Sequence, residues 1–257
     1  RLIGSFSLSK GNGKTDVFRP AQHTAFEGIA DPAKRGDFRR TQQENFQYSL
    51  DLTASYNKLL GEVHYVTANA RMSVQESKNE NYGAHVTGFP NENMDEILFG
   101  KQYDEKMTGS ENTSRLIGWA GSFGYSYAYK YSVDFSIRLD GSSQFGKDNR
   151  FAPFWAAGVR WDVKKENFMS RVDFISEFVL RASYGVTGTQ GFAPYQSREL
   201  YSYNALLYPY LASDGTGVEL VAMPNEKLKW QQTDTWNIGL EMGLLNGRIT
   251  ARAEYFH

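Results

Sequence analysis

Apolar and polar residues alternate with a period of two along several stretches of the chain. Between residues 46 and 56, the apolar side chains Phe46, Tyr48, Leu50, Leu52, Ala54 and Tyr56 alternate with Gln47, Ser49, Asp51, Thr53 and Ser55. Successive side chains of a β-strand point to opposite faces, so this pattern predicts a strand with one apolar and one polar face. Its length suffices to cross a bilayer at a tilt, for which about 9–11 residues are needed.

The same alternation recurs often enough to predict about nine strands. Clear repeats lie at 119–129, 131–140, 178–186, 236–242 and 249–255, and weaker strands are expected at 1–9, 63–75 and 154–162. Short and long connections alternate between them. Tight turns are expected at 57–61, Lys130 and Asn246-Gly247, a link with room for one helical turn at 163–176, and long loops at 10–44, 77–112, 141–152 and 188–229. Outer-membrane barrels have this arrangement, with short turns at one end and long loops at the other.

A soluble β-sandwich would also alternate, because one face of each sheet covers a core. Three features favour a membrane barrel instead. The polar faces carry many charges, the expected strands exceed the five or six residues usual in soluble sheets, and aromatic residues gather beside a short turn at Tyr125, Tyr127, Tyr129 and Tyr131. We therefore predict an all-β fold, an antiparallel transmembrane β-barrel wall with an apolar lipid face and a polar lumen face.

Composition removes several classes of function. The net charge of -1 provides no basic field for nucleic acid, and the absence of cysteine excludes disulfides and thiolate metal sites. Mean hydropathy is -0.54, and no apolar run reaches the ~18 residues of a membrane helix. The four histidines are scattered, and no nucleophile and base stand together, so we expect no enzyme, no cofactor and no metal site. The chain starts at Arg1 and stops at His257 directly after a strand pattern, so we expect it to be a piece of a longer protein.

Five segments in the C-terminal half resemble the SusC/RagA-like group of TonB-dependent outer-membrane transporters. They are Arg138–Gly146, Leu180–Gln190, Pro224–Gln231, Trp236–Glu241 and Gly243–Arg248, in the order expected of that group. The departures are single substitutions: Gln144 stands where Arg is more usual, Thr189 where Asn is commoner, Glu226 where Pro is common and Gln231 where Glu is common. The motifs cover roughly residues 115–257, and residues 1–114 resemble the group only in their strand pattern.

The resemblance implies a large plugged barrel of about 22 strands. Residues 1–257 would be a partial barrel domain, with the plug domain and the remaining strands absent. The implied function is import of oligosaccharides, peptides or similar nutrients through the Gram-negative outer membrane. The implied partners are outer-membrane lipid, the TonB complex acting through the missing plug region, and a SusD-like surface lipoprotein lid. A secreted β-rich binding or adhesion module is the alternative.

Two groups of residues are candidates for contacts with ligands or partners. The first lies in the longest expected loop and consists of Tyr201, Tyr203, Tyr208, Tyr210 and Asp214. Exposed aromatic and polar side chains suit a substrate or a lid, although these tyrosines could equally pack the loop on itself. The second consists of the polar-face charges Asp134, Arg138, Asp140, Arg181, Arg252 and Glu254. We expect these to contact the plug or one another more often than the passing substrate, because buried charges tend to be paired.

Overall fold

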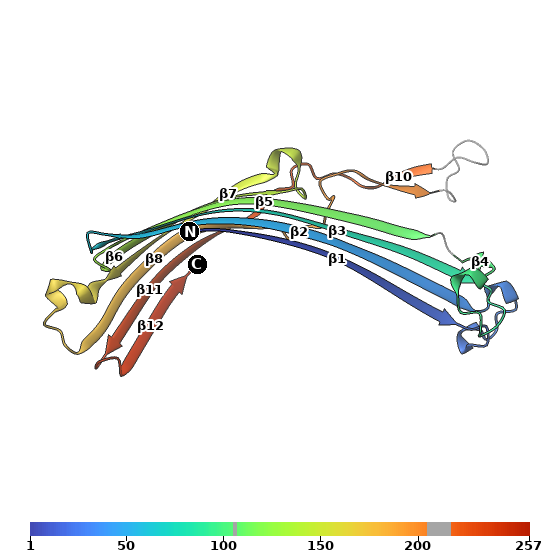
Figure 1. The fold of residues 1–257 in the computed structure, drawn as a ribbon, viewed down its shortest axis with the longest axis horizontal. Coiled ribbons are helices and arrows are strands. Elements are labelled where there is room, and N and C mark those ends of the chain that lie inside the picture. The colour runs from blue at the N-terminus through green and yellow to red at the C-terminus, as the bar shows by residue number, and fades with distance from the viewer. Residues whose placement is uncertain (105–106, 205–216) are drawn as a thin grey trace. The chain divides into compact units, whose positions relative to one another are not determined.

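The computed structural model describes residues 1–104, 107–204 and 217–257, and almost all of its regular structure is β-strand (Figure 1). The strands are β1 (Leu2–Arg19), β2 (Asp37–Leu60), β3 (His64–Thr87), β4 (Gln102–Tyr103), β5 (Thr108–Tyr127), β6 (Tyr131–Ser142), β7 (Phe151–Asp162), β8 (Ile175–Thr189), β9 (Leu200–Asn204), β10 (Gly217–Ala222), β11 (Gln231–Leu244) and β12 (Ile249–Phe256). Six three-residue 3-10 turns lie between them: η1 (Thr24–Phe26), η2 (Pro32–Lys34), η3 (Ile97–Phe99), η4 (Lys147–Asn149), η5 (Val163–Lys165) and η6 (Asn167–Met169). Across the described ranges, no helix is long and apolar enough to span a membrane.

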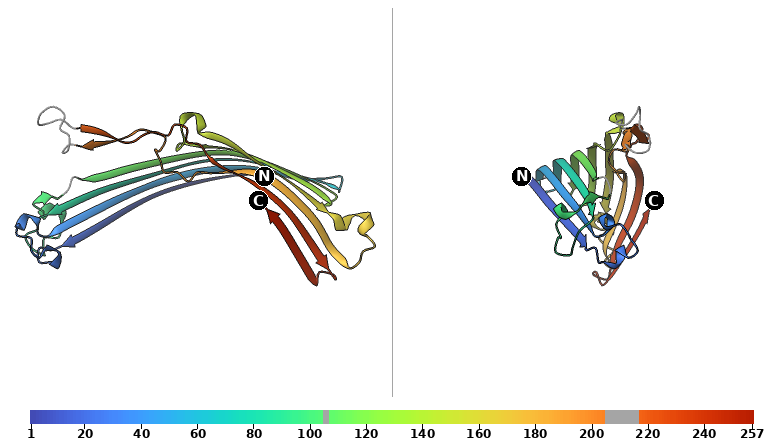
Figure 2. Two further views of the ribbon diagram at one scale, coloured as in Figure 1. Left: turned by 180° about the vertical axis from the view of Figure 1, so that it is seen from behind. Right: turned by 90° about the vertical axis from the view of Figure 1, so that its right-hand side faces the viewer.

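Ten of the strands form one sheet in the order β1-β2-β3-β5-β6-β7-β8-β11-β12, and the short β4 pairs with β3. Neighbouring strands in this order are consecutive along the chain, except that β4 lies between β3 and β5 and that β9 and β10 lie between β8 and β11; in Figure 2 the colours pass from yellow β8 to red β12. Strands β9 and β10 form a separate antiparallel hairpin. The predicted all-β antiparallel architecture is confirmed, with β1 and β12 at the two free ends of the strand order.

The chain divides into two compact units. The first contains residues 1–6, 50–75 and 115–257, and the second contains residues 7–49 and 76–114. Strands β1, β2, β3 and β5 contribute residues to both units. Each unit is described below by itself.

The strands of the second unit extend much further than the sequence pattern predicted. Loops were expected at 10–44 and 77–112, but β1 continues to Arg19, β2 begins at Asp37, β3 continues to Thr87 and β5 begins at Thr108. The connections are therefore residues 20–36 and 88–107. The prediction was wrong because both faces of these segments carry polar residues, so the apolar period of two is lost although the backbone remains extended and paired.

In the first unit, the pairing register gathers the apolar residues on one face of the sheet. Phe135 of β6 lies opposite Phe123 of β5 and Ala157 of β7, and Tyr184 of β8 lies opposite Ala157 and Trp236. Directly opposed residues of antiparallel strands share a face, so this row continues across five strands. Phe123, Phe135 and Trp236 are 50%, 43% and 55% exposed. The predicted alternation is confirmed, and the apolar face lies open rather than against a core.

Aromatic residues at the short-turn end of this face are held by one carboxylate. The rings of Tyr131 and Trp161 stack with centroids 6.4 Å apart. The Tyr131 hydroxyl and the Trp161 indole, at 3.2 Å, both donate to Glu166 Oε1 in the connector between β7 and β8. These donors, the Tyr131 hydroxyl foremost, lower the pKa of the Glu166 carboxyl below its ordinary value. Ionised Glu166 therefore fixes the orientation of two amphipathic rings, which is the geometry expected of an interfacial aromatic belt.

A cluster of buried aromatic residues explains two of the segments that carry the family resemblance. Phe145, Phe154 and Trp230 form it together with Ala152. The centroid of Trp230 lies 4.8 Å from that of Phe145 and 5.6 Å from that of Phe154. Segments 138–146 and 224–231 thus pack against each other near the ends of β6, β7 and β11.

A change on the apolar face tests its contact with lipid. If lipid covers this face, Phe135→Arg near the bilayer midplane costs about 2–4 kcal/mol, because a charged side chain there loses its hydration. Denaturant unfolding of the full-length protein in lipid vesicles measures this loss. Ser136→Arg, one residue along on the opposite face, is the matched control and costs much less. Equal losses at the two positions would contradict a lipid-facing surface.

Gly146 provides a test of the packing between the two segments. A Cβ added there would lie 1.9 Å from the carbonyl oxygen of Glu226, which is backbone and cannot rotate away. Gly146→Ala is expected to displace segment 224–230 at a cost of about 1–3 kcal/mol, as in other overpacked sites. Limited trypsin digestion should then cut faster after Lys227 and Lys229. Gly158→Ala, whose nearest neighbour would be the Ser183 Cβ at 3.7 Å, should leave cleavage unchanged.

Candidate functional site

The polar face of the first unit has a floor of small side chains. Ser136 of β6 lies opposite Ser122 of β5 and Ala156 of β7. In the next row, Asp134 lies opposite Gly124 and Gly158. A Cβ at Gly124 would lie 2.9 Å from Asp134 Oδ1, so glycine leaves the space that this carboxylate uses. Short side chains across three strands keep the polar surface low.

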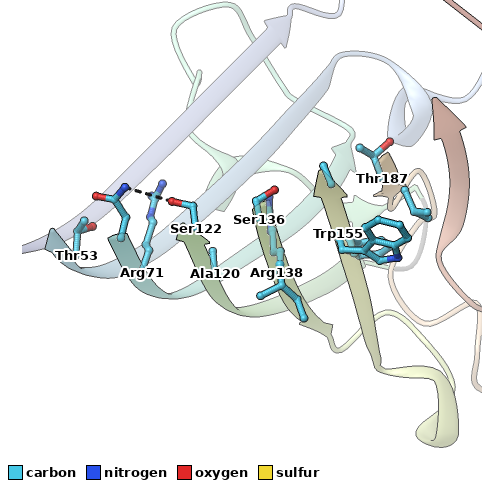
Figure 3. A pocket seen from close by; sticks show the side chains of 14 residues that line it. Thr53, Arg71, Ala120, Ser122, Ser136, Arg138, Trp155 and Thr187 are labelled. Atoms are coloured by element: carbon cyan, nitrogen blue, oxygen red, sulfur yellow. Dashed lines mark hydrogen bonds between the residues drawn. The ribbon is translucent and has the colours of Figure 1, made fainter. Parts of the chain in front are cut away.

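A cavity of about 380 Å³ lies over this floor (Figure 3). Its lining residues are Thr53, Asn69, Arg71, Ala120, Gly121, Ser122, Ser136, Ile137, Arg138, Phe154, Trp155, Ala156, Val186 and Thr187. Asn69 Nδ2 donates to Ser122 Oγ at 3.2 Å, which joins β3 to β5 at the floor. Hydroxyl and amide groups dominate the polar lining, which also includes the guanidiniums of Arg71 on β3 and Arg138 on β6.

Both guanidiniums beside the cavity are paired with carboxylates. Arg71 Nη2 lies 2.6 Å from Asp51 Oδ1, and Arg138 Nε lies 2.6 Å from Asp140 Oδ1. Asp140 is only 6% exposed, so its charge needs the partner that Arg138 supplies. The predicted site residues Arg138 and Asp140 thus lie together on the polar face, and the sequence analysis missed Asp51 and Arg71 as a second pair.

A second group of charges joins β8, β11 and β12. Arg181 Nη2 and Arg252 Nη2 lie 2.6 and 2.7 Å from Glu241 Oε1, and Arg181 Nη2 lies 3.5 Å from Glu254 Oε1. Three predicted site residues, Arg181, Arg252 and Glu254, therefore meet around Glu241, which the sequence analysis left out. The strict alternation of β11 and β12 does place Glu241 opposite Arg252, so hairpin register was the signal that could have found it.

The tyrosine-rich segment is only partly described. Tyr201 in β9 is 57% exposed, and its hydroxyl donates to Glu199 Oε2 at 2.6 Å. The hydrogen bond to the Glu199 carboxylate raises the pKa of the Tyr201 hydroxyl above its ordinary value. The backbone of Tyr203 pairs with Val218 in the β9–β10 hairpin. Tyr208, Tyr210 and Asp214 lie outside the described residues.

The second unit contains a buried ion network that sequence reasoning did not find. Asp37 is 2% exposed, and its carboxylate accepts from Arg19 Nε at 2.7 Å. His85 lies between two carboxylates, with Nε2 3.1 Å from Asp37 Oδ2 and Nδ1 3.1 Å from Asp104 Oδ2. These partners come from distant parts of the chain, so spacing along the sequence could not indicate them. Within the described ranges, no three His, Asp or Glu side chains form a group that could hold a metal ion.

Removing the shared carboxylate tests the charge group around Glu241. Glu241→Gln leaves Arg181 and Arg252 without their common partner. The expected loss of unfolding free energy is about 1 kcal/mol, because the arginine side chains are 40% and 68% exposed and water screens the pairs. Glu254→Gln, which removes one longer contact, should change stability by less than about 0.5 kcal/mol in the same denaturant titration. Equal effects would show that Glu241 does not organise the group.

The chain is similar to known proteins with a β-barrel domain. The family described as "TonB dependent receptor-like, beta-barrel" matches residues 4–257. TonB-dependent receptor P3 of Formosa agariphila is 29% identical over 98% of this chain and 24% of its own length. TonB-dependent receptor SusC of Bacteroides thetaiotaomicron is 35% identical over 65% of this chain and 17% of its own length. The chain thus spans about a quarter or less of the curated relatives that it matches.

Solved structures agree with this assignment at the level of the fold. The RagAB peptide transporter superposes with a TM-score of 0.87 at 24% sequence identity, over 99% of this chain and 27% of that one. The RagAB peptide importer in the "open-open" state gives 0.84 over the same shares. The family match and the 35% identity to SusC confirm the resemblance that residues 138–248 indicated, and the solved structures agree with it in fold. The chain belongs to the TonB-dependent receptor-like β-barrel family, a family of transport receptors and not of enzymes.

Proposed function

We propose that residues 1–257 form part of the barrel wall of a TonB-dependent active transporter in the Gram-negative outer membrane. The transporter imports nutrients such as oligosaccharides or peptides, and the rest of the protein supplies the plug domain and the remaining strands. The observation that carries this proposal is the sheet of the first unit, which exposes an apolar aromatic face and has charged and hydroxyl side chains on the other. Family membership supports it.

In the proposed barrel wall, each face of the sheet contacts a different environment. The apolar face meets lipid, where the backbone is already satisfied by neighbouring strands and side chains such as Phe123 and Phe135 have no hydrogen bonds to lose. The polar face lines a water-filled lumen. The outer edges of β1 and β12 pair with the missing strands, because an open sheet edge is not tolerated within a membrane.

The paired charges of the polar face suit a lumen that must hold a plug and still let it move. Arg71, Arg138 and Glu241 each have a partner on the wall. Because each of these charges has a partner on the wall, none of them is left alone when the plug moves away. We assign contact with the plug to Asp134, Arg138, Asp140, Arg181, Arg252 and Glu254.

Partners follow from the same proposal. The TonB complex supplies energy through the plug region, and a SusD-like surface lipoprotein covers the outer mouth as a lid. The RagAB structures, described as a peptide transporter, share the fold of this chain, and this likeness agrees with a role in import. We assign contact with substrate or lid to the segment that holds Tyr201, Tyr203, Tyr208, Tyr210 and Asp214.

Single-cysteine labelling tests the topology, and the chain has no cysteine of its own. In an antiparallel meander, the β3–β5 connection and the β11–β12 turn lie at opposite ends of their strands. A membrane-impermeant maleimide should react with Asn93→Cys on intact cells expressing the full-length protein. It should react with Arg248→Cys only after the outer membrane is opened. Both residues are exposed, so burial alone cannot explain a difference.

Equal labelling of both positions on intact cells would contradict the topology. Recovery of the full-length protein in the culture medium, labelled at both positions, would instead support a secreted binding module. Surface abundance measured by immunoblot should be the same for the two variants, so that assembly defects are not read as protection.

A further inference from the structure

The strands of the second unit present two faces of very different chemistry. We define the neutral face as the odd-numbered residues of 7–17 in β1, 41–49 in β2 and 77–83 in β3, with the even-numbered residues of 108–114 in β5. The reverse face holds the residues between them. Alternation along each strand places these two sets on opposite sides.

Contacts between strands confirm that each set lies on one side. Gln43 Cβ lies 3.9 Å from the Cβ position of Gly13, and Thr108 Oγ1 lies 2.5 Å from that of Gly83. On the reverse face, Arg40 Nε lies 2.8 Å from Asp16 Oδ1. Lys78 Nζ lies 3.4 Å from Glu111 Oε1, and the Tyr48 hydroxyl donates to Glu76 at 3.2 Å.

The neutral face contains no ionisable carboxylate, amine or guanidinium. Apart from Val17, all of its residues are Ser, Thr, Asn, Gln or Gly. Within the same residue ranges, the reverse face carries Lys10, Lys14, Asp16, Glu44, Lys78, Glu80 and Glu111. A solvent-exposed protein surface ordinarily mixes charges of both signs at about a quarter to a third of its positions. The reverse face meets that expectation, and the neutral face departs from it.

Burial does not explain the departure, because Gln43, Asn45 and Gln47 are exposed. The charges at the edge of the neutral face share one buried carboxylate. Asp37 is paired with Arg19 and His85, and Arg39 Nε lies 3.5 Å from Asp37 Oδ2. The neutral face is thus accessible to water and rich in hydrogen-bonding groups, and none of the residues that define it offers a charged ligand a countercharge.

We propose that the neutral face binds uncharged, hydroxyl-rich oligosaccharides on their way into the transporter and selects them over charged solutes. This inference rests on the proposed function and names the substrate class. Each sugar hydroxyl both donates and accepts, and so does each Asn, Gln, Ser or Thr side chain. A carboxylate or ammonium that lies against the face loses part of its hydration and finds hydrogen-bonding groups there but no opposite charge.

The neutral face has little relief from side chains, which leaves room for an extended oligosaccharide. Glycines at 11, 13 and 83 keep the surface low where long side chains would obstruct it. Thr41, Gly83 and Thr108 line a hollow of about 160 Å³, together with Arg39, Arg40, Ala84 and His85. The neutral face has no aromatic residue, so recognition there depends on hydrogen bonds and not on ring stacking. Each such bond exchanges with water at small net free energy, which allows a bound sugar to move on.

Near-isosteric charge substitutions in the full-length transporter test the proposal. Gln43→Glu with Asn45→Asp adds two carboxylates to the neutral face. Gln42→Glu with Asn12→Asp adds the same two charges to the reverse face and is the matched control. Cells receive a mixture of neutral gluco-oligosaccharides, oligogalacturonides and tryptic peptides, and mass spectrometry follows loss of each class from the medium. We expect uptake of neutral oligosaccharides to fall about tenfold in the neutral-face variant and less than about twofold in the control.

A strain that lacks the transporter separates this inference from the proposed function. If its uptake of all three classes equals that of the parent strain, the proposed function fails and the inference falls with it. If its uptake is lost but the two double variants retain equal uptake, the neutral face is only a hydrated wall, and this inference alone is overturned. Dependence of only peptides or oligogalacturonides on the transporter would overturn it as well. Should the neutral-face variant reach the surface poorly, Asn81→Asp on β3 replaces it, with the same expected direction.

Discussion

The antiparallel backbone ladder is the interaction on which the rest of this structure depends. Because each strand satisfies the amide and carbonyl groups of its neighbours, the sheet needs no hydrophobic core to bury its backbone. Phe135 and Trp236 can therefore stay exposed on one face while Ser136 and Asn237 occupy the other. In the second unit, backbone pairing is supported by ion pairs and by one small buried cluster of Phe38, Val86 and Phe89.

Packing against this ladder decides where connections go. The cluster of Phe145, Phe154 and Trp230 ties two connections to each other, and Gly146 permits the close approach of the Glu226 carbonyl. Segments 138–146 and 224–231, which resemble the family, are thus explained by their packing against each other. Charge is arranged differently in the two units. The polar face of the first has ion pairs around Asp140 and Glu241, whereas the neutral face of the second has none. In the proposed transporter, the charged surface of the first unit contacts the plug, and the uncharged surface of the second unit contacts sugars.

The sequence by itself determined the fold class and the family. It also determined which residues of the strands between 119 and 255 lie on the apolar face and which lie on the polar face. A period of two is a local property, and it reports the two faces wherever one of them is apolar. Where both faces are polar that signal disappears, and for this reason the extension of β1 to Arg19 and of β3 to Thr87 was missed.

Only the tertiary structure decided which charges meet. Asp37 and His85, Asp51 and Arg71, and Arg181 and Glu241 are distant in sequence and adjacent in space. Their pairing depends on the register between strands, and no single strand encodes that register. The residues that make up the neutral and reverse faces can likewise be read from the sequence. The contrast between the two faces became visible once pairing showed that four separate segments share one side, because a surface is defined by strands brought together and not by any one of them.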